Sequence, residues 1–477
     1  MNSDPHLLWI GGQSVPASSG EWFDDLNPID DSLYATLSKA NAQDVDSAVC
    51  AAQTAFESYR NSLPSDREGW LIRAAELLIA QSDEFVALLI DEVGSPISKA
   101  RKEISTSVGL LRAAAGATRQ LSGKTLPTNV PGRISISTRQ PLGVIAGITP
   151  FNVPLIKGIK HSAMPLATGN TVVLLPSELA PLTTLRIAKL FSDAGIPDGA
   201  FNVITGNGYE IGDTLVSHPD VKLVGFTGST TVGNRIHALC GQHGKRVTLE
   251  MGGKNPLVVL KDADLDKALS ASVLGSFLYQ GQICMASSRI YVERPVYDTF
   301  VDRLCAAASG LGRGDLRDPK TMIGPIISSR QRNRIQQHVN DAVTKGAALR
   351  VGGDWEGHRY QPTVLTDVSE DATLFGEETF GPVTAVYPID SVHEALRLAN
   401  ASPYGLCASI FTSDLQSAMQ FAQQVQAGMV HINGATIQEE PHVPFGGVGN
   451  SGFGLESTDV DLADLTQWKW ITVQYDE

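Results

Sequence analysis

The chain has 477 residues, of which 42% are hydrophobic and 18% are charged, and its formal net charge is −14. This length and composition indicate a globular protein of two or three domains and exclude a disordered chain. The negative charge argues against nucleic acid as a partner, because neutralising phosphates needs a basic surface.

The first part of the chain is predicted to be helical after a short β hairpin. The hairpin spans His6–Ala17 and turns at Gly11 and Gly12, and a further strand is expected at Leu33–Leu37. Apolar residues at helical spacing then predict three helices, which span Ala42–Tyr59, Ser65–Glu92 and Ile97–Ala117.

Two separate stretches have the alternating pattern of lone β strands. Gln120–Gln140 contains the alternation Arg133–Ser137, and Leu465–Val473 alternates around Trp468 and Trp470. Strands with an apolar face and open edges need a partner, and we expect another copy of the chain to supply it. A flap within the same chain is the alternative.

Pro141–Gly253 alternates between apolar strands and helices. This alternation predicts a parallel sheet with right-handed crossovers, whose ligands bind at the carboxyl ends of the strands. The strands are expected at Gly143–Ile148, Thr171–Leu175, Asn202–Thr205, Val221–Gly225 and Arg246–Glu250, and the helices at Leu155–Ala167, Leu182–Ala194, Tyr209–Ser217 and Thr231–His243. The usual GxGxxG is absent. The nearest motif, Gly228–Gly233, opens a helix and is either a diphosphate site or a plain N-cap.

A second α/β unit is predicted from Asn255 onward. Its strands are expected at Pro256–Leu260, Arg289–Glu293, Cys407–Phe411 and Met429–Ile432. Its helices are expected at Leu265–Tyr279, Val296–Leu311, Ser328–Lys345, Val392–Ala399 and Leu415–Gln426. The stretch between Lys345 and Val392, which carries Phe375–Pro382, is expected to be irregular.

Cys284 lies at the junction between a predicted helix and a predicted strand. A nucleophile at such a junction is held rigidly and faces a cleft. The other four of the five cysteines fall inside predicted elements, where an inert packing role is expected, and a buried inert thiol is also the alternative for Cys284. No CxxC pair is present, so the cysteines give neither a disulfide framework nor a zinc signature.

Neither a signal peptide nor a membrane span is visible in the sequence, which predicts a soluble, cytoplasmic protein with no membrane partner. Met1–Gln13 has no basic n-region, and no run approaches the roughly 20 apolar residues of a membrane span. A reducing compartment also suits a catalytic thiol.

Two further residues have side chains that would support a nucleophilic thiol. Asn152, in PFNVP, offers an uncharged amide that can stabilise an oxyanion, although a turn former is the alternative. Glu250, in LEMGGK, follows an apolar strand at the end where a cleft is expected. Burial there would raise its pKa and suit it to act as a base. Its alternative role is an ion pair with Lys254.

PFNVP, LEMGGK and GQIC, in this order and followed by PFGGVGNSGFG, resemble the signatures of the NAD(P)-dependent aldehyde dehydrogenases. FLYQGQICM and HINGATIQEEPHVPFGG look most like the branch of benzaldehyde, vanillin and salicylaldehyde dehydrogenases. The resemblance implies an α/β fold with a Rossmann-like parallel-sheet cofactor domain, a second α/β catalytic domain and a small β oligomerisation arm. The cofactor domain would comprise 1–119 and 140–251, the catalytic domain 252–457, and the arm 120–139 and 458–477.

The resemblance also implies the chemistry and the partners. An aldehyde, from an aromatic compound by the branch, would form a thiohemiacetal and then a thioester on Cys284, which water activated by Glu250 would hydrolyse. NAD is expected in preference to NADP, because Leu175 replaces a lysine that usually meets the adenosine ribose. A homodimer or homotetramer and no metal are expected. An aliphatic or semialdehyde dehydrogenase, a CoA-acylating relative and a catalytically silent relative are the alternatives.

The implied binding residues fall into two sets. The cofactor would be held by Thr149, Pro150, Phe151, Leu175, Ser177, Glu178, Gly208, Phe226, Thr227, Gly228, Ser229, Val232, Gly252, Glu378 and Phe380. The substrate would contact Val153, Lys160, Tyr279, Ile283 and Met285, with Tyr279 offering a flat face to a ring. A solvated helix face is the default for Lys160.

Overall fold

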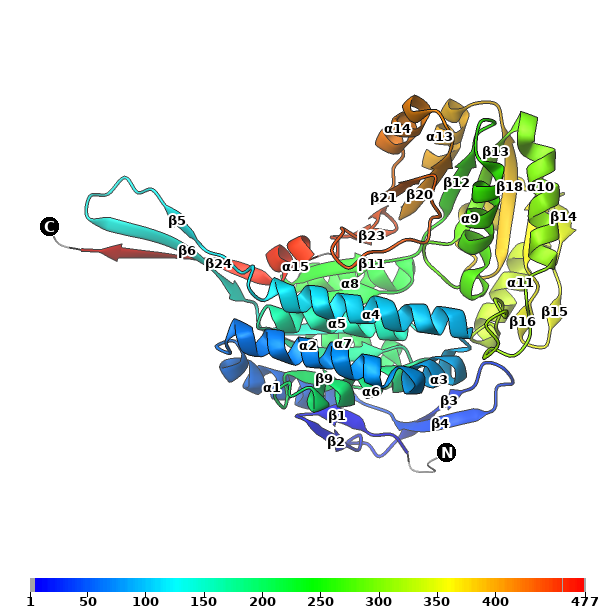
Figure 1. Ribbon diagram of the computed structural model, residues 1–477. Helices are drawn as coiled ribbons and strands as arrows, with labels where there is room; N and C mark the ends of the chain where they lie inside the picture. Colours follow the sequence, from blue (N-terminus) through cyan, green and yellow to red (C-terminus); the bar gives the residue numbers. More distant parts are fainter. Residues whose placement is uncertain (1–4, 457, 476–477) are drawn as a thin grey trace.

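The computed structural model describes residues 5–456 and 458–475. Figure 1 shows two α/β bodies side by side and a thin β arm that projects from the first of them. Both bodies contain a sheet built mainly of parallel strands, which confirms the predicted fold class. The domain boundaries stay a prediction, and their outermost positions, residues 1–4, 457 and 476–477, lie outside the described residues.

The first body is built on a sheet with the strand order β2-β1-β9-β8-β7-β10-β11-β23 among the described residues. Its parallel strands β9, β8, β7, β10 and β11 are mostly buried from end to end, because helices cover both faces. These strands are Phe201–Val203, Thr171–Pro176, Val144–Thr149, Val221–Thr227 and Arg246–Glu250. The flanking strands β2, β1 and β23 are Gln13–Val15, Leu8–Ile10 and Gly452–Phe453.

Alternate residues of this sheet contribute to two cores. Ile145, Val172 and Leu174 pack beneath α2 to α6, whereas Val144 and Val173 pack beneath α1, α7 and α8 on the other face. The helices α1 to α8 span Ala42–Tyr59, Pro64–Ala80, Ser82–Val93, Ile97–Ala117, Pro154–Ala167, Pro181–Asp193, Gly208–Ser217 and Thr230–Gln242.

Most of the elements predicted for the N-terminal part of the chain are present in the structure. The hairpin β1–β2 turns at Gly11 and Gly12, and the strand β4 (Leu33–Ser38) pairs with β3 (Trp22–Leu26), which was not foreseen. The single helix predicted over Ser65–Glu92 is wrong, since the structure divides it at Gln81 into α2 and α3. Two acidic residues follow in the first turn of α3, where the helix dipole favours negative charge.

The second body is built on a sheet with the order β14-β17-β18-β13-β12-β20-β21 among the described residues. These strands are Ala348–Val351, Thr363–Thr366, Val383–Ile389, Ser287–Glu293, Asn255–Val259, Cys407–Phe411 and Met429–Ile432. All pairs are parallel except β14–β17. Its helices are α9 (Leu265–Phe277), η1 (Leu278–Gly281), α10 (Arg294–Ser309), α11 (Ser329–Thr344), α12 (Thr373–Gly376), α13 (Val392–Asn400) and α14 (Leu415–Gln424).

The stretch predicted to be irregular, between Lys345 and Val392, supplies three strands of this second sheet. The prediction is wrong there because β17 and β18 are short apolar runs whose strand character depends on burial within the sheet. The small pairs β15 (Trp355–Glu356) with β16 (Arg359–Tyr360) and β19 (Tyr404–Gly405) with β22 (Val448–Gly449) complete the body.

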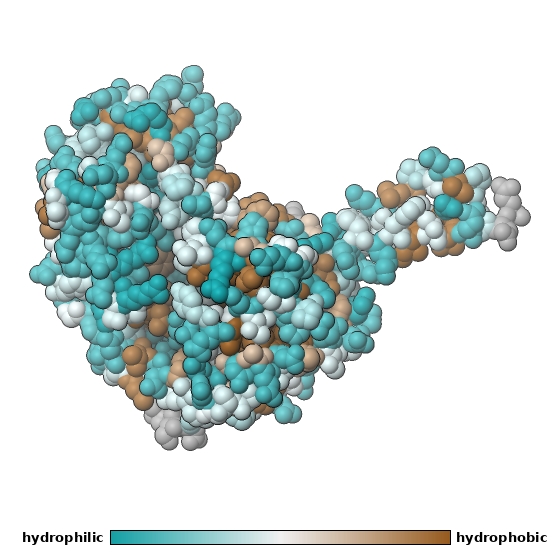
Figure 2. Space-filling view, turned by 180° about the vertical axis from the view of Figure 1, so that it is seen from behind, coloured by the Kyte–Doolittle hydropathy of each residue, from teal (hydrophilic) through white to brown (hydrophobic). Residues whose placement is uncertain are grey.

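The arm is a three-stranded sheet with the order β24-β6-β5. Its strands are Thr466–Gln474, Arg133–Pro141 and Lys124–Leu126, and β24 follows the short helix α15 (Thr458–Asp464). The two stretches predicted as lone strands therefore pair with each other, with Trp470 opposite Ser137. Figure 2 shows apolar side chains on the surface of this projecting arm.

One late segment returns to the first body. Strand β23 pairs antiparallel with β11, so that Gly452 lies opposite Glu250. The chain that precedes and follows β23 is thereby brought against the carboxyl ends of the first sheet.

Within the described residues, every helix is too short or too polar to cross a lipid bilayer. The same residues contain no grouping of three or more His, Cys, Asp or Glu side chains suited to a metal ion.

Candidate active site

A cavity of about 370 Å³ lies at the carboxyl ends of β7, β8, β10 and β11, and residues of the second body also line it. The cavity thus lies at the strand ends where the sequence analysis expected ligands to bind. All predicted catalytic residues line the cavity, and so do all predicted cofactor residues. These residues are spread along the chain from Thr149 to Phe380, and the fold brings them together.

The turn before Cys284 has three consecutive residues in the left-handed region. The φ angles are 50° at Tyr279, 46° at Gln280 and 69° at Gly281. The Gln280 side chain is fully buried and donates from Nε2 to the carbonyl oxygen of Pro325 at 2.7 Å. Strained residues persist where their neighbours fix them, so this turn holds the following thiol in place.

Cys284 is half-buried, and its carbonyl oxygen accepts a hydrogen bond from Asn255 Nδ2 at 2.8 Å. Burial raises the pKa of its thiol to about 12, Lys157 opposes that rise, and Glu378 and Glu250 add to it. The thiolate is the nucleophilic form of cysteine. Ionisation near neutral pH therefore depends on positive charge close to the sulfur.

Asn152 is buried, lines the same cavity as Cys284 and is fixed at both ends. Its Nδ2 donates to the carbonyl oxygen of Gln282 at 2.9 Å, and its carbonyl oxygen accepts from Lys99 Nζ at 2.7 Å. Lys99 is paired with Glu103, whose carboxylate also accepts from the backbone N–H of Leu155 at 3.0 Å. Because an amide carries two N–H donors, Asn152 keeps one for an oxyanion.

Glu250 ends β11 and is only 2% exposed, and neither of its carboxylate oxygens has a hydrogen-bond partner among the described residues. Burial and the charge of Glu456 raise its pKa well above the usual range, while Lys157 and Lys160 lower it. The ion pair with Lys254 is therefore not formed. An unpaired buried carboxylate in a cavity has the properties of a general base.

Glu378 and Phe380 reach the cavity from the second body. Glu378 accepts a hydrogen bond from the backbone N–H of Gly253 at 3.0 Å, and burial raises the pKa of its carboxyl to about 7. Phe380 has a φ of 56° and contacts Phe151 edge to face, with ring centroids 5.9 Å apart. Phe380 thus contacts the first body across the cavity, and Glu378 is bound by the segment between β11 and β12.

Of the predicted substrate residues, Val153 lines the cavity, whereas Tyr279, Ile283 and Met285 are buried and do not line it. The expectation that Tyr279 presents its ring to the cavity is not met. Its hydroxyl donates to the carbonyl oxygen of Val93 at 2.8 Å, and its ring is enclosed in the core. The ring therefore supports the turn before Cys284 from inside the protein.

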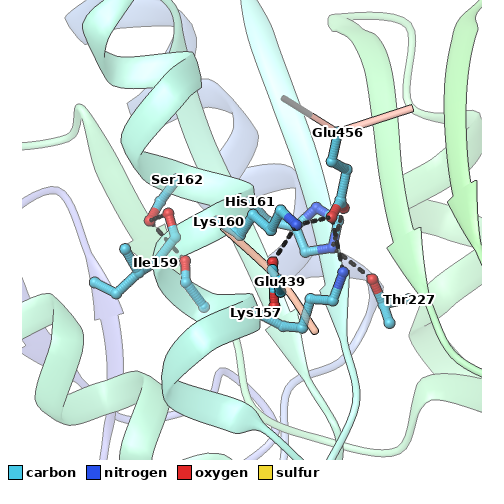
Figure 3. A network of polar contacts seen from close by, with 9 residues as sticks. Lys157, Ile159, Lys160, His161, Ser162, Thr227, Glu439 and Glu456 are labelled. Carbon is cyan, nitrogen blue, oxygen red and sulfur yellow. Dashed lines mark hydrogen bonds and ion pairs between the residues drawn. The ribbon is translucent and has the colours of Figure 1, made fainter. Parts of the chain in front are cut away.

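Lys160 does not lie on a solvated face, so its default interpretation is wrong. Its Nζ lies 2.6 Å from Glu439 and 3.0 Å from Glu456, and 4.1 Å from the ring centroid of Phe445. Figure 3 shows this buried network of charged side chains next to α5. The two carboxylates come from the segment that returns to the first body, which the sequence alone does not place.

Lys157 is a cavity residue that the sequence analysis did not identify. It precedes Lys160 by three residues, so the two side chains share one face of α5, and it follows Val153, the residue just before the helix, by four. That spacing was the signal available in the sequence. Polar residues of α11 were also missed, namely Arg330, Gln331 and Arg334.

Comparisons with known proteins agree with this geometry. The profile described as the aldehyde dehydrogenase family matches residues 15–471. A vanillin dehydrogenase of Pseudomonas sp. is 42% identical over 470 residues, which are 98% of this chain and 97% of that protein. A benzaldehyde dehydrogenase of Bacillus subtilis is 38% identical over 471 residues, which are 98% of this chain and 97% of that protein. The crystal structure of a salicylaldehyde dehydrogenase from Pseudomonas putida, complexed with salicylaldehyde, superposes with a TM-score of 0.96 at 35% identity and covers 99% of this chain and 98% of that one. The chain belongs to the aldehyde dehydrogenase family.

Proposed function

We propose that this protein oxidises aromatic aldehydes to carboxylic acids, with NAD as the preferred hydride acceptor. The convergence of Cys284, Asn152 and Glu250 on one cavity carries the proposal. The aromatic substrate class is supported by the relatives, which are named for vanillin, benzaldehyde and salicylaldehyde.

The reaction needs a nucleophile, because a free aldehyde carbon is a poor hydride donor. The Cys284 thiolate adds to the carbonyl carbon, and the π electron pair moves to the oxygen, where the Asn152 amide stabilises it. Collapse of this alkoxide expels hydride and leaves a thioester on Cys284. Glu250 then removes a proton from water as the water oxygen attacks the thioester, and the acid and the free thiol are released.

The cavity has features that fit a nicotinamide dinucleotide, which supplies the hydride acceptor. Gly228 and Ser229 line it at the start of α8, and the Ser229 side chain makes no capping hydrogen bond. The first N–H groups of this helix are thus available to a diphosphate. The half-buried carboxylate of Glu378 can accept a hydrogen bond from a ribose hydroxyl, and the Phe380 ring lines the same cavity.

The enzyme is expected to prefer NAD over NADP by at least about tenfold in kcat/KM, which corresponds to about 1.4 kcal/mol. The 2′-phosphate of NADP needs a cation or several donors. Leu175 offers no donor, and Glu178 would repel a phosphate; both line the cavity. Leu175→Lys should therefore raise kcat/KM with NADP more than with NAD.

Arg235 provides the control for this preference. It also lines the cavity, but its guanidinium is paired with Asp213. Arg235→Gln should leave the low NADP activity of the unmodified enzyme low. Equal or better kcat/KM with NADP in the unmodified enzyme would contradict the argument, and loss of that activity in Arg235→Gln would identify the responsible cation.

Kinetics over a panel of aldehydes test the substrate class directly. Benzaldehyde, vanillin and salicylaldehyde are expected to show higher kcat/KM than short aliphatic aldehydes and semialdehydes, with NADH absorbance as the measurement. Assays with and without CoA distinguish hydrolysis of the thioester from acyl transfer to CoA. Because Glu250 is the proposed base for hydrolysis, the rate is expected not to depend on CoA. Faster turnover of the aliphatic aldehydes would overturn the aromatic assignment.

The arm is proposed to join copies of this chain into a homodimer or homotetramer. Both β24 and β5 are edge strands, and Trp468 and Trp470 on β24 are 48% and 67% exposed. Trp470→Asp should reduce the molar mass measured by light scattering. Leu415→Asp changes a similarly exposed apolar residue on α14 and should leave the mass unchanged. A monomeric unmodified protein would rule out the assembly.

A further inference from the structure

Lys157 places a positive charge in the wall of the cavity that holds the reactive thiol. The residue lies in the second turn of α5, and it lines the same cavity as Asn152, Glu250 and Cys284. Its side chain is only 4% exposed. A buried ammonium group is costly unless it is paired, so its presence here calls for a specific reason.

The ammonium group of Lys157 is fixed in position. Its Nζ lies 2.8 Å from Glu456 and 4.9 Å from the ring centroid of Phe445, as Figure 3 shows in part. Glu456 is shared with Lys160, which also binds Glu439. The carboxylates are therefore held by two lysines together, and Lys157 is the one of the two that reaches the cavity.

Three carboxyl groups act on the thiol in the direction opposite to Lys157. Glu250, Glu378 and Glu439 raise the pKa of the Cys284 thiol further after burial has raised it, and Lys157 lowers it. His161, in the same network, adds no charge near neutral pH, because burial lowers its pKa to about 4. A thiolate at this position is therefore stabilised by Lys157 and opposed by these three carboxyl groups.

We propose that Lys157 is the positioning residue that stabilises the Cys284 thiolate by a fixed positive charge. The thiol proton leaves to water in the cavity, and the electron pair on sulfur then forms the bond to the aldehyde carbon. This inference rests on the proposed role of Cys284 as the nucleophile. It adds the group through which a buried thiol becomes reactive near neutral pH.

The test compares the alkylation rate of Cys284 by iodoacetamide in the unmodified protein and in Lys157→Met, without cofactor or substrate. The exposed Cys50 is alkylated in the same sample and serves as the reference, with both peptides quantified by mass spectrometry. The ratio of the Cys284 rate to the Cys50 rate should fall at least about threefold at neutral pH. Each unit by which the thiol pKa rises lowers the thiolate fraction tenfold. A more basic thiolate is also a stronger nucleophile, so the alkylation rate falls by less than the thiolate fraction does.

Two further variants exclude a purely structural role. Lys157→Arg keeps the charge and should keep the ratio within twofold of the unmodified protein. Lys157→Gln keeps a donor to Glu456 without the charge and should behave as Lys157→Met does. In all three variants Glu456 retains Lys160 as a partner, so none of them leaves its carboxylate without a cation.

The outcomes separate this inference from the proposed function. An unchanged ratio in Lys157→Met and Lys157→Gln, or an equal fall in Lys157→Arg, would overturn the role of Lys157. Alkylation does not require turnover, so these results hold whatever the substrate is. Failure of the proposed nucleophile would appear instead as aldehyde oxidation that survives the loss of Cys284.

Discussion

Replacing Cys284 by alanine is expected to reduce aldehyde oxidation by at least about 10³-fold while NAD binding is retained. Addition of the thiol sulfur is what makes the aldehyde carbon a hydride donor. The residues that would hold the cofactor, at the start of α8 and around Glu378, are unchanged in this variant. Steady-state NADH formation measures the first effect, and titration of NAD by protein fluorescence measures the second.

Cys50→Ala is the matched control for this variant. Cys50 is exposed on α1 and lies outside the cavity, so its loss should leave activity unchanged. Substantial oxidation by Cys284→Ala would mean that another group is the nucleophile, and the proposed mechanism would fail.

Glu250→Gln is expected to slow thioester hydrolysis by at least about 10²-fold and to let an acyl-enzyme accumulate. Glutamine has the same shape but cannot accept a proton from water, so thiol addition and hydride loss continue. A burst of about one NADH per site should precede a slow steady state, and intact-protein mass spectrometry should show the acyl group on the peptide of Cys284.

The pH dependence of hydrolysis has a defined sign. Burial raises the pKa of Glu250, and the base is active in its ionised form, so hydrolysis should become faster as pH rises and level off above that pKa. Glu250→Gln should lose this rise. Normal turnover by the Gln variant would show that Glu250 is structural and that the base lies elsewhere.

Much of the fold was predictable because strand and helix alternation constrains a parallel sheet. The apolar run Thr171–Leu175 was predicted as a strand from its own residues. The structure has the six-residue strand β8 there, and every residue of it is buried. Prediction failed where local signals were weak. The break at Gln81 separates two helices that share one apolar pattern, and β17 is only four residues long. The burial that makes such a segment a strand comes from the rest of the sheet.

The candidate site divides in the same way. Asn152 and Glu250 follow predicted strands, so the rule that ligands bind at strand ends was enough to expect them at one cleft. Cys284 precedes a strand of the second body, and only the fold brings it to the same cavity. The residues that line the substrate side of the cavity could not be predicted from their nearness to Cys284 along the chain. Tyr279 and Met285 lie near Cys284 along the chain, yet both are buried in the core, and Tyr279 itself adopts a left-handed conformation that its sequence neighbours do not announce.

The sequence by itself determined the reactive groups and the type of sheet that presents them, since both depend on residue identity and on short-range periodicity. Only the tertiary structure decided the electrostatics around the thiol. Lys157 meets a carboxylate 299 positions away, at Glu456, and Lys160 meets Glu439 across 279 positions. Such pairs form when β23 carries the late segment back to β11. The charge that a buried side chain experiences depends on these distant partners and on the exclusion of water, and neither is encoded in its neighbours along the chain.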